Sequence, residues 1–182
     1  CGPTSLRMIA RYYGLDYSTE MLRKHCHITR QGVNLLGISE AAEYIGFETA
    51  GVKVTFEQLA EEGVFPCILH WNQNHFVVCY GIEKCKNGGF KIHISDPASQ
   101  RLTYTKDEFE RCWIGPQADE NSNGVALMLE PSDDFGKIED EYRKNSRSML
   151  SFARYFTPYR NMIGQLVLAM LVGSVIQMIL PF

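Results

Sequence analysis

The first part of the chain, to about Lys53, places apolar residues at helical intervals. Residues 2–14 show the i, i+3, i+4, i+7 spacing of one helical face most clearly. The apolar residues there are Leu6, Ile9, Ala10 and Tyr13. Pro3 suits a first helical turn and Gly14 a helix stop. Similar patterns predict helices around residues 19–26 and over residues 35–46.

The pattern then changes to that of strands. Thr55 and Gln58 form a capping-box pattern for a short helix. Three β-rich runs follow, and the last two are joined by Asn-Gly-Gly, a strong hairpin signal. These runs occupy residues 67–71, 75–83 and 90–95. Another capped helix is predicted from Thr105, and residues 124–130 predict a final strand. Helices followed by an antiparallel sheet predict an α+β fold in which the N-terminal helices pack on the sheet.

Three segments follow the domain expected over residues 1–130. Residues 131–147 are charged and lack an apolar period, which is typical of a linker. Residues 148–161 are aromatic and basic, and we expect them to lie along a membrane surface. Residues 162–182 are largely apolar and uncharged, which predicts the start of a transmembrane helix, with a hydrophobic core helix as the alternative. Arginines and lysines precede this run, so the N-terminal domain is expected to face the cytoplasm.

Composition narrows the class of protein. The formal net charge is −3 and no basic stripe is present, which argues against a nucleic-acid partner. The six cysteines lie in or beside predicted helices and strands, so they do not indicate a disulfide framework. We therefore expect a reduced, cytosolic setting. Because the chain begins with Cys and not Met, we expect it to be processed or to be a stretch of a longer protein.

Cys1 stands at or just before the N-terminus of the first predicted helix. Unpaired amides and the helix dipole favour an anion there, and a thiol in such a place can be held as the nucleophilic thiolate. A thiol nucleophile needs a base, and the base needs an orienting partner. His75 starts a strand after a polar turn, and Asp96 ends the next strand before Pro97. Since hairpin pairing brings these strand ends together, we expect His75 and Asp96 to lie close in space.

The order Cys1, His75, Asp96 is that of papain-like cysteine peptidases, with the nucleophile on a helix and the other two on adjacent strands. Taken singly, His75 also fits a surface histidine at a strand start, and Asp96 a turn-forming Asp-Pro. The three together predict a catalytic site.

Other candidates for chemistry are weaker. His25, Cys26 and His27 are consecutive, and neighbours one or two apart on a helix do not converge on one ion, so we expect no metal there. The remaining strand histidines, His70 and His93, are expected to face solvent or a hydrogen-bond partner. The strand cysteines Cys67 and Cys79 fit small core residues.

Four runs carry a family resemblance: CGPTSLRMIARYYG, GISEAAEYIGFETAGVKV, PCILHWNQNHFVV and ISDPA. Together they resemble the bacteriocin-processing cysteine peptidase domain at the N-terminus of peptidase-containing ABC transporters. The likeness extends through residues 1–130. The tail from about Ser148 resembles the start of the first transmembrane helix of such an exporter.

The resemblance implies that Cys1 is the nucleophile, His75 the general base and Asp96 its orienting residue. It implies an endopeptidase that cleaves the leader of a bacteriocin-like or pheromone precursor after a double-glycine-type site, coupled to export. The precursor peptide is then the partner, and a homodimer is expected for the full transporter in the plasma membrane. No cofactor is expected in this chain; ATP and Mg²⁺ are expected in a nucleotide-binding domain beyond it.

Two features of the family bear on rate and specificity. The family places a glutamine, a donor to the oxyanion, a few residues before the cysteine, and we expect it in a segment upstream of Cys1. A cleft that reads glycine must be narrow, and Trp71 is a candidate for its wall, with a core aromatic as the alternative.

Two other functions remain open from the sequence. One is a non-catalytic domain that docks cargo at the membrane. The other is an N-terminal-nucleophile amidohydrolase that uses the α-amine of Cys1 as base, although such nucleophiles usually start a strand and Pro3 predicts a helix here. The sequence does not identify the cargo peptide or the surface that binds the leader.

Overall fold

Three helices open the chain, as the apolar spacing predicts. They are α1 (Gly2–Tyr12), α2 (Thr19–His25) and α3 (Leu35–Tyr44). The computed structural model describes residues 1–28, 32–85, 88–116, 122–138, 165 and 170–174. α1 ends just before Gly14, which has a φ of +89°. α3 begins at a polar N-cap, because Oδ1 of Asn34 accepts the Gly37 N–H at 2.8 Å.

A sheet of six strands follows, and its strand pairs are all antiparallel. The strands are β1 (Phe47–Val54), β2 (Cys67–Trp71), β3 (His75–Lys84), β4 (Phe90–Ser95), β5 (Arg101–Tyr104) and β6 (Gly124–Pro131). Their order across the sheet is β1-β6-β2-β3-β4-β5, so the last strand lies between the first two. Two short helices, α4 (Phe56–Glu62) and α5 (Lys106–Trp113), connect strands. The α+β class is confirmed.

Two strands lie where the sequence pattern predicts none. β1 occupies the end of the block expected to be helical, so that prediction is wrong from Phe47 onward. β5 is the other unpredicted strand. Both are edge strands of the sheet, and an edge strand pairs on one side only. β1 pairs from Phe47 opposite Pro131 to Val54 opposite Gly124, so its partner is remote in sequence.

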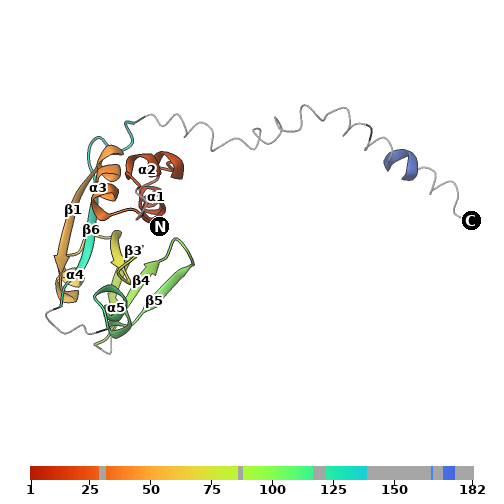
Figure 1. Ribbon diagram of the computed structural model, residues 1–182. Coiled ribbons are helices and arrows are strands. Elements are labelled where there is room, and N and C mark those ends of the chain that lie inside the picture. The colour runs from red at the N-terminus through yellow and green to blue at the C-terminus, as the bar shows by residue number, and fades with distance from the viewer. Residues whose placement is uncertain (29–31, 86–87, 117–121, 139–164, 166–169, 175–182) are drawn as a thin grey trace, which may run out of the picture. The chain divides into compact units, whose positions relative to one another are not determined.

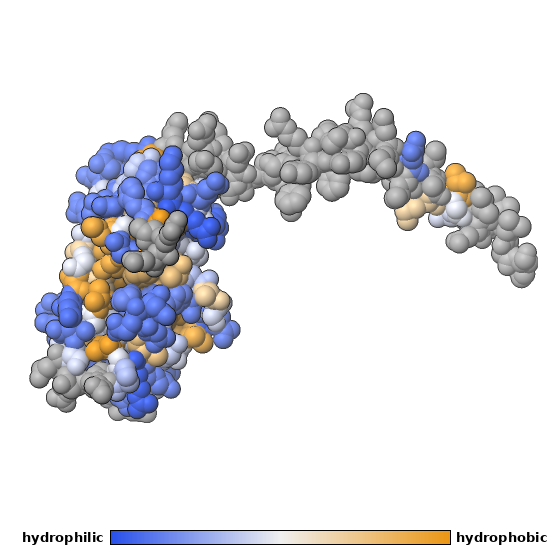
Figure 2. All heavy atoms as spheres, viewed as in Figure 1, coloured by the Kyte–Doolittle hydropathy of each residue, from blue (hydrophilic) through white to orange (hydrophobic). Residues whose placement is uncertain are grey.

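Apolar side chains fill both faces of the sheet centre, because consecutive residues of a strand point to opposite faces. On one face, α1, α2 and α3 pack against a set that includes Ile68, Phe76 and Leu127. On the other face, α4 and α5 pack against a set that includes Leu69 and Val77. Figure 1 shows α1–α3 grouped beside the sheet, apart from α4 and α5. Figure 2 shows hydrophilic side chains over the ends of the domain formed by these helices and the sheet, and hydrophobic ones gathered between them.

The folded unit spans Cys1–Arg143, and Lys144–Phe182 forms a second unit. Oγ of Ser132 donates to the Gly46 carbonyl at 2.7 Å, and the ring of Phe135 packs 4.5 Å from that of Phe47. The chain therefore contributes to the core beyond the boundary predicted at residue 130.

No helix among the described residues is long and apolar enough to cross a membrane. Residues 139–147 of the predicted linker and the predicted membrane-surface segment, residues 148–161, lie outside the described residues. So does most of the run over residues 162–182, of which residues 165 and 170–174 are described and helical.

Candidate active site

Cys1 is the N-cap of α1, and its side chain is exposed. Its carbonyl oxygen accepts the Ser5 N–H at 2.9 Å and so closes the first helical turn. Gly2 lets this turn pack closely on α3, because a Cβ there would lie 2.6 Å from Cδ1 of Ile38. The thiol thus sits at a helix N-terminus with packed residues beneath it. Since Cys1 caps a helix and does not start a strand, the geometry argues against the N-terminal-nucleophile alternative.

His75 is the first residue of β3 and lies opposite Trp71 of β2. The short loop between them is a tight hairpin turn, in which Asn72 and Gln73 have φ values of +47° and +62°. α5 holds this loop in place, since the Asn72 N–H donates to the Cys112 carbonyl at 2.8 Å. The polar turn predicted from the sequence therefore fixes the position of the histidine.

Asp96 follows β4 directly, and strand pairing returns it to the start of β3. Nε2 of His75 lies 2.8 Å from Oδ1 of Asp96, and each side chain is 22% exposed. The same oxygen accepts the Ala98 N–H at 2.8 Å. Nδ1 of His75 has no hydrogen bond within the described part of the chain, which leaves that nitrogen available to a thiol.

The environment of Asp96 favours the carboxylate. Partial burial raises the pKa of Asp96, but hydrogen bonds from His75 and from the Ala98 N–H lower it, and the net pKa lies below its ordinary value. A carboxylate in this position orients the imidazole ring and stabilises its protonated form.

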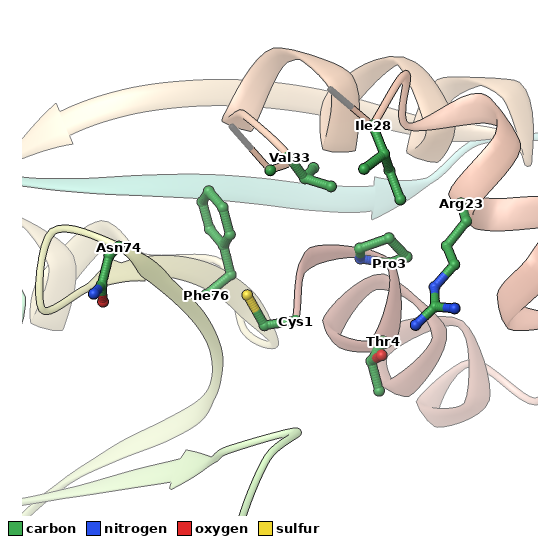
Figure 3. A pocket seen from close by; sticks show the side chains of 9 residues that line it. Cys1, Pro3, Thr4, Arg23, Ile28, Val33, Asn74 and Phe76 are labelled. Atoms are coloured by element: carbon green, nitrogen blue, oxygen red, sulfur yellow. The ribbon is translucent and has the colours of Figure 1, made fainter. Parts of the chain in front are cut away.

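A cavity of about 470 Å³ opens beside Cys1. Its lining comes from the start of α1, from α2, from the segment before α3 and from the start of β3. The lining residues are Cys1, Pro3, Thr4, Arg23, Ile28, Gly32, Val33, Asn74 and Phe76. Figure 3 shows the Cys1 sulfur turned toward Phe76, with Val33 beside the Phe76 ring. The thiol and the apolar side chains of Phe76 and Val33 therefore face the same cavity.

The sequence patterns do not single out Val33, Asn74 or Phe76. Asn74 and Phe76 flank His75 in the chain, and that adjacency is a signal by which they could have been found. Val33 has no such signal, because only the packing of α3 on α1 brings it to the cavity. Trp71 does not line this cavity: it is 4% exposed and packs in the core with its ring 5.5 Å from that of Phe109.

The other candidate residues contact neighbours in the fold. The rings of His25 and Tyr44 stack with centroids 3.7 Å apart, and His27 lies 3.8 Å from Glu40. Within the described residues, no group of three or more His, Cys, Asp or Glu side chains is arranged to hold a metal ion. Cys67 and Cys79 are fully buried opposite each other, and Nδ1 of His93 lies 3.2 Å from Oγ1 of Thr103.

Comparison with known proteins gives sequence relatives that are larger than this chain. The profile of the Peptidase C39 family matches residues 1–118. The transport/processing ATP-binding protein ComA of Streptococcus pneumoniae is 32% identical over 187 residues, which cover 98% of this chain and 23% of ComA. The probable microcin-H47 secretion/processing ATP-binding protein MchF of Escherichia coli is 29% identical over 151 residues, which cover 83% of this chain and 20% of MchF. The chain thus spans about a quarter or less of the length of these relatives.

Solved structures share the fold. A double glycine motif protease from an AMS/PCAT transporter, crystallised in complex with the leader peptide, matches with a TM-score of 0.62 and 36% identity over 72% of this chain and 84% of that one. The peptidase domain of Streptococcus ComA matches with a TM-score of 0.58 and 29% identity over 72% of this chain and 91% of that one. The family profile covers more than half of the residues, and the chain therefore belongs to the peptidase C39 family.

Proposed function

We propose that this chain is a papain-like cysteine endopeptidase, with Cys1, His75 and Asp96 as its catalytic residues. One observation carries the proposal. An exposed cysteine at a helix N-cap lines a cavity, and a histidine whose Nε2 contacts a carboxylate at 2.8 Å lies on the strand that borders the same cavity. The nucleophile, the base and its orienting partner needed for acyl transfer are thus on adjacent elements.

The chemistry follows from these roles. Nδ1 of His75 takes the proton of the Cys1 thiol, and the thiolate attacks the carbonyl carbon of the scissile peptide bond. The imidazolium then gives its proton to the leaving amine, and an acyl-enzyme remains on Cys1. A water molecule, deprotonated by His75, hydrolyses this thioester and restores the thiol. Asp96 holds the ring in place and stabilises its charged form throughout.

The substrate proposed is a precursor peptide with a double-glycine-type leader, cut after the glycine pair. A double glycine motif protease that is 36% identical was crystallised with the leader peptide, which supports this class of substrate. In our chain, Phe76 and Val33 stand beside Cys1 in the cavity, and a wall of large side chains there would admit hydrogen but not a larger group. Phe76 and Val33 thus replace Trp71 as the wall that reads glycine.

Residues near the cut cannot distinguish one leader from every glycine pair in a cell, so affinity must come from elsewhere. A second cavity of about 520 Å³ lies between α1 and β3. Its lining includes the exposed ring of Tyr12, the ring of Tyr80 and the side chains of Met8 and Val78. An amphipathic helix of the leader would place its apolar face here.

The remainder of the proposal concerns the whole protein. The relatives described as transport/processing or secretion/processing ATP-binding proteins support a role in export. We infer that the complete protein is a multi-pass plasma-membrane ABC transporter that works as a homodimer, with this domain on the cytoplasmic side. Residues 148–182 would then lead into the membrane, and ATP and Mg²⁺ would bind in the part beyond this chain.

Incubation of the protein with double-glycine precursor peptides, followed by mass analysis, tests the proposal. We expect cleavage after the glycine pair, none with Cys1→Ala, and unchanged cleavage with Cys85→Ala, a matched control at a partly exposed cysteine outside the cavity. Replacing the last glycine of the substrate by Val should lower kcat/KM on the order of 100-fold, because a carbonyl displaced by about 1 Å is out of reach of the thiolate. Cleavage by Cys1→Ala, or indifference to Val, would contradict the proposal.

A further inference from the structure

Ser5 is a fully buried polar residue on α1, one helical turn after Cys1. Its Oγ donates a hydrogen bond to the carbonyl oxygen of Phe76 at 3.2 Å, across 71 residues of sequence. Its N–H donates to the carbonyl oxygen of Cys1 at 2.9 Å. One residue is therefore bonded both to the proposed nucleophile and to the residue that follows the proposed base, His75.

The two elements that Ser5 joins must keep a fixed distance. Cys1 is carried by α1 and His75 by β3, and proton transfer requires Sγ and Nδ1 to lie within hydrogen-bond reach. The apolar contacts between these elements, such as those of Leu6 and Ile9, attract without a preferred direction. A hydrogen bond has a directional preference that apolar contacts lack, so the Ser5 contact constrains where β3 lies along α1.

The backbone geometry explains why this contact acts on the site and not only on stability. The carbonyl of Phe76 lies one residue beyond His75, close to the start of β3. At the other end of the same histidine, Asp96 holds Nε2. The ring is thus oriented by Asp96, whereas the backbone that carries it is held against the cysteine helix by Ser5.

We propose that Ser5 is a positioning residue of the peptidase: its hydroxyl sets the distance between Cys1 and His75. The inference rests on the proposed catalytic roles of these two residues. Loss of the Ser5 hydroxyl should leave substrate binding in place and impair the chemical step. A misplacement of about 1 Å costs on the order of 100-fold in rate, so even part of that displacement should be measurable.

The test compares Ser5→Ala with Ser132→Ala in the intact protein. Ser132 is a matched control, because its Oγ also donates to a distant backbone carbonyl, that of Gly46 at 2.7 Å, but away from the cavity. We expect Ser5→Ala to lower kcat at least 10-fold with KM changed less than about threefold. Ser132→Ala should lower the thermal midpoint and leave kcat unchanged. Ser5→Thr keeps the hydroxyl and should recover most of the activity. This variant keeps the proposal testable if Ser5→Ala does not fold.

A second readout needs no substrate. The rate of Cys1 alkylation by iodoacetamide, followed by mass analysis of the Cys1 peptide, reports the thiolate as a function of pH. Because a charged imidazole within about 4–6 Å favours the thiolate, Ser5→Ala should move the midpoint of this profile upward by about one pH unit, and Ser132→Ala should not. If wild-type protein cleaves no leader but the midpoint still moves, the substrate proposal fails and the Ser5 role stands. Equal kcat and alkylation profiles in Ser5→Ala and wild type would overturn the role of Ser5.

Discussion

Asp96 and His75 are joined by a hydrogen bond, but replacing one or the other should not lower kcat equally. His75→Ala removes the proton acceptor, and we expect kcat to fall by roughly 10²- to 10⁴-fold. Asp96→Asn should cost less, because an amide can still hold Nε2 of the ring although it cannot stabilise the imidazolium. Steady-state kinetics on one leader substrate, with circular dichroism to confirm folding, measures both. An Asp96→Asn enzyme slower than His75→Ala would contradict this division of roles.

At the scale of residues, the candidate site was largely predictable from the sequence and its wall was not. Cys1 precedes a helix pattern, and His75 and Asp96 stand at strand ends that a local hairpin joins, so each position follows from short-range signals. Ser5 is read from the sequence as one more position on a helix, because its partner Phe76 is remote. The strand pattern around Trp71 fits both a wall of the cleft and a core aromatic. Only packing decides that its side chain faces α5 and not the cavity.

At the scale of elements, Asp16 holds α1 against the start of α2. Its carboxylate accepts hydrogen bonds from Arg7 at 2.8 Å and Arg11 at 2.9 Å, while Arg7 also donates to Thr19 at 3.1 Å. The hydrogen bond from Arg11 is the largest cause that lowers the pKa of Asp16; burial opposes it and Arg7 adds to it. Because α1 carries Cys1, this cluster also supports the site.

The lowered pKa gives Asp16 a predictable effect on acid stability. A carboxyl group with a depressed pKa in the folded state stabilises the fold above its unfolded pKa of about 3.9, and that contribution is lost as pH falls toward the folded pKa. Asp16→Asn should lower the Tm by roughly 2–4 °C at pH 7, the shift that corresponds to about 1 kcal/mol for a partly exposed pair. The difference should shrink below about pH 4.

Asp134→Asn is the matched control, because Asp134 pairs with Lys137 where both side chains are more than half exposed. The Tm of Asp134→Asn should change little both at pH 7 and below about pH 4. Scanning calorimetry at several pH values measures both variants. A Tm difference for Asp16→Asn that grows on acidification would mean that the carboxylate does not stabilise the fold.

Gly46 joins α3 to β1 where no other residue fits. Its φ is +93°, and a Cβ there would lie 2.6 Å from the backbone of Phe135. Gly14 also has a positive φ, of +89°, but has nothing within 4 Å of such a Cβ. Gly14→Ala should therefore cost only backbone strain, roughly 1–2 kcal/mol, and Gly46→Ala should cost about 1–3 kcal/mol more. Urea unfolding of the two variants separates the cost of backbone strain from that of steric overlap. Equal losses in the free energy of unfolding would show that the backbone of residues 134–135 moves aside at little cost.

The elements were predictable where their signals are local. The caps and apolar faces of α1–α3 and the hairpin of β3 and β4 lie within short windows, and the predicted capping box of α4 is present, with the Thr55 N–H donating to Gln58 at 3.0 Å. β1 escaped prediction because its partner strand begins at Gly124 and its own alternation, at Val52, Lys53 and Val54, is short.

At the scale of the whole molecule, the order of strands predicts where the chain can be shortened. The family profile ends at residue 118, but β6 begins at Gly124 and pairs with both β1 and β2. A chain that ends at residue 118 should lack the strand that joins β1 to β2 and show no cooperative thermal transition. A chain that ends at residue 138 keeps β6 and the contact of Phe135 with the core, and should unfold cooperatively. A cooperative transition in the shorter chain would contradict this account.

The place of β6 also orders events during synthesis. The ribosome delivers β1 and β2 early, yet these strands are separated by a gap that only the last strand fills. Until Pro131 has left the exit tunnel, the nascent chain presents two open strand edges, each a template for pairing with another chain. The helix that carries the thiol is thus synthesised well before the sheet is complete, and we expect the nascent domain to show no peptidase activity until β6 has joined β1 to β2.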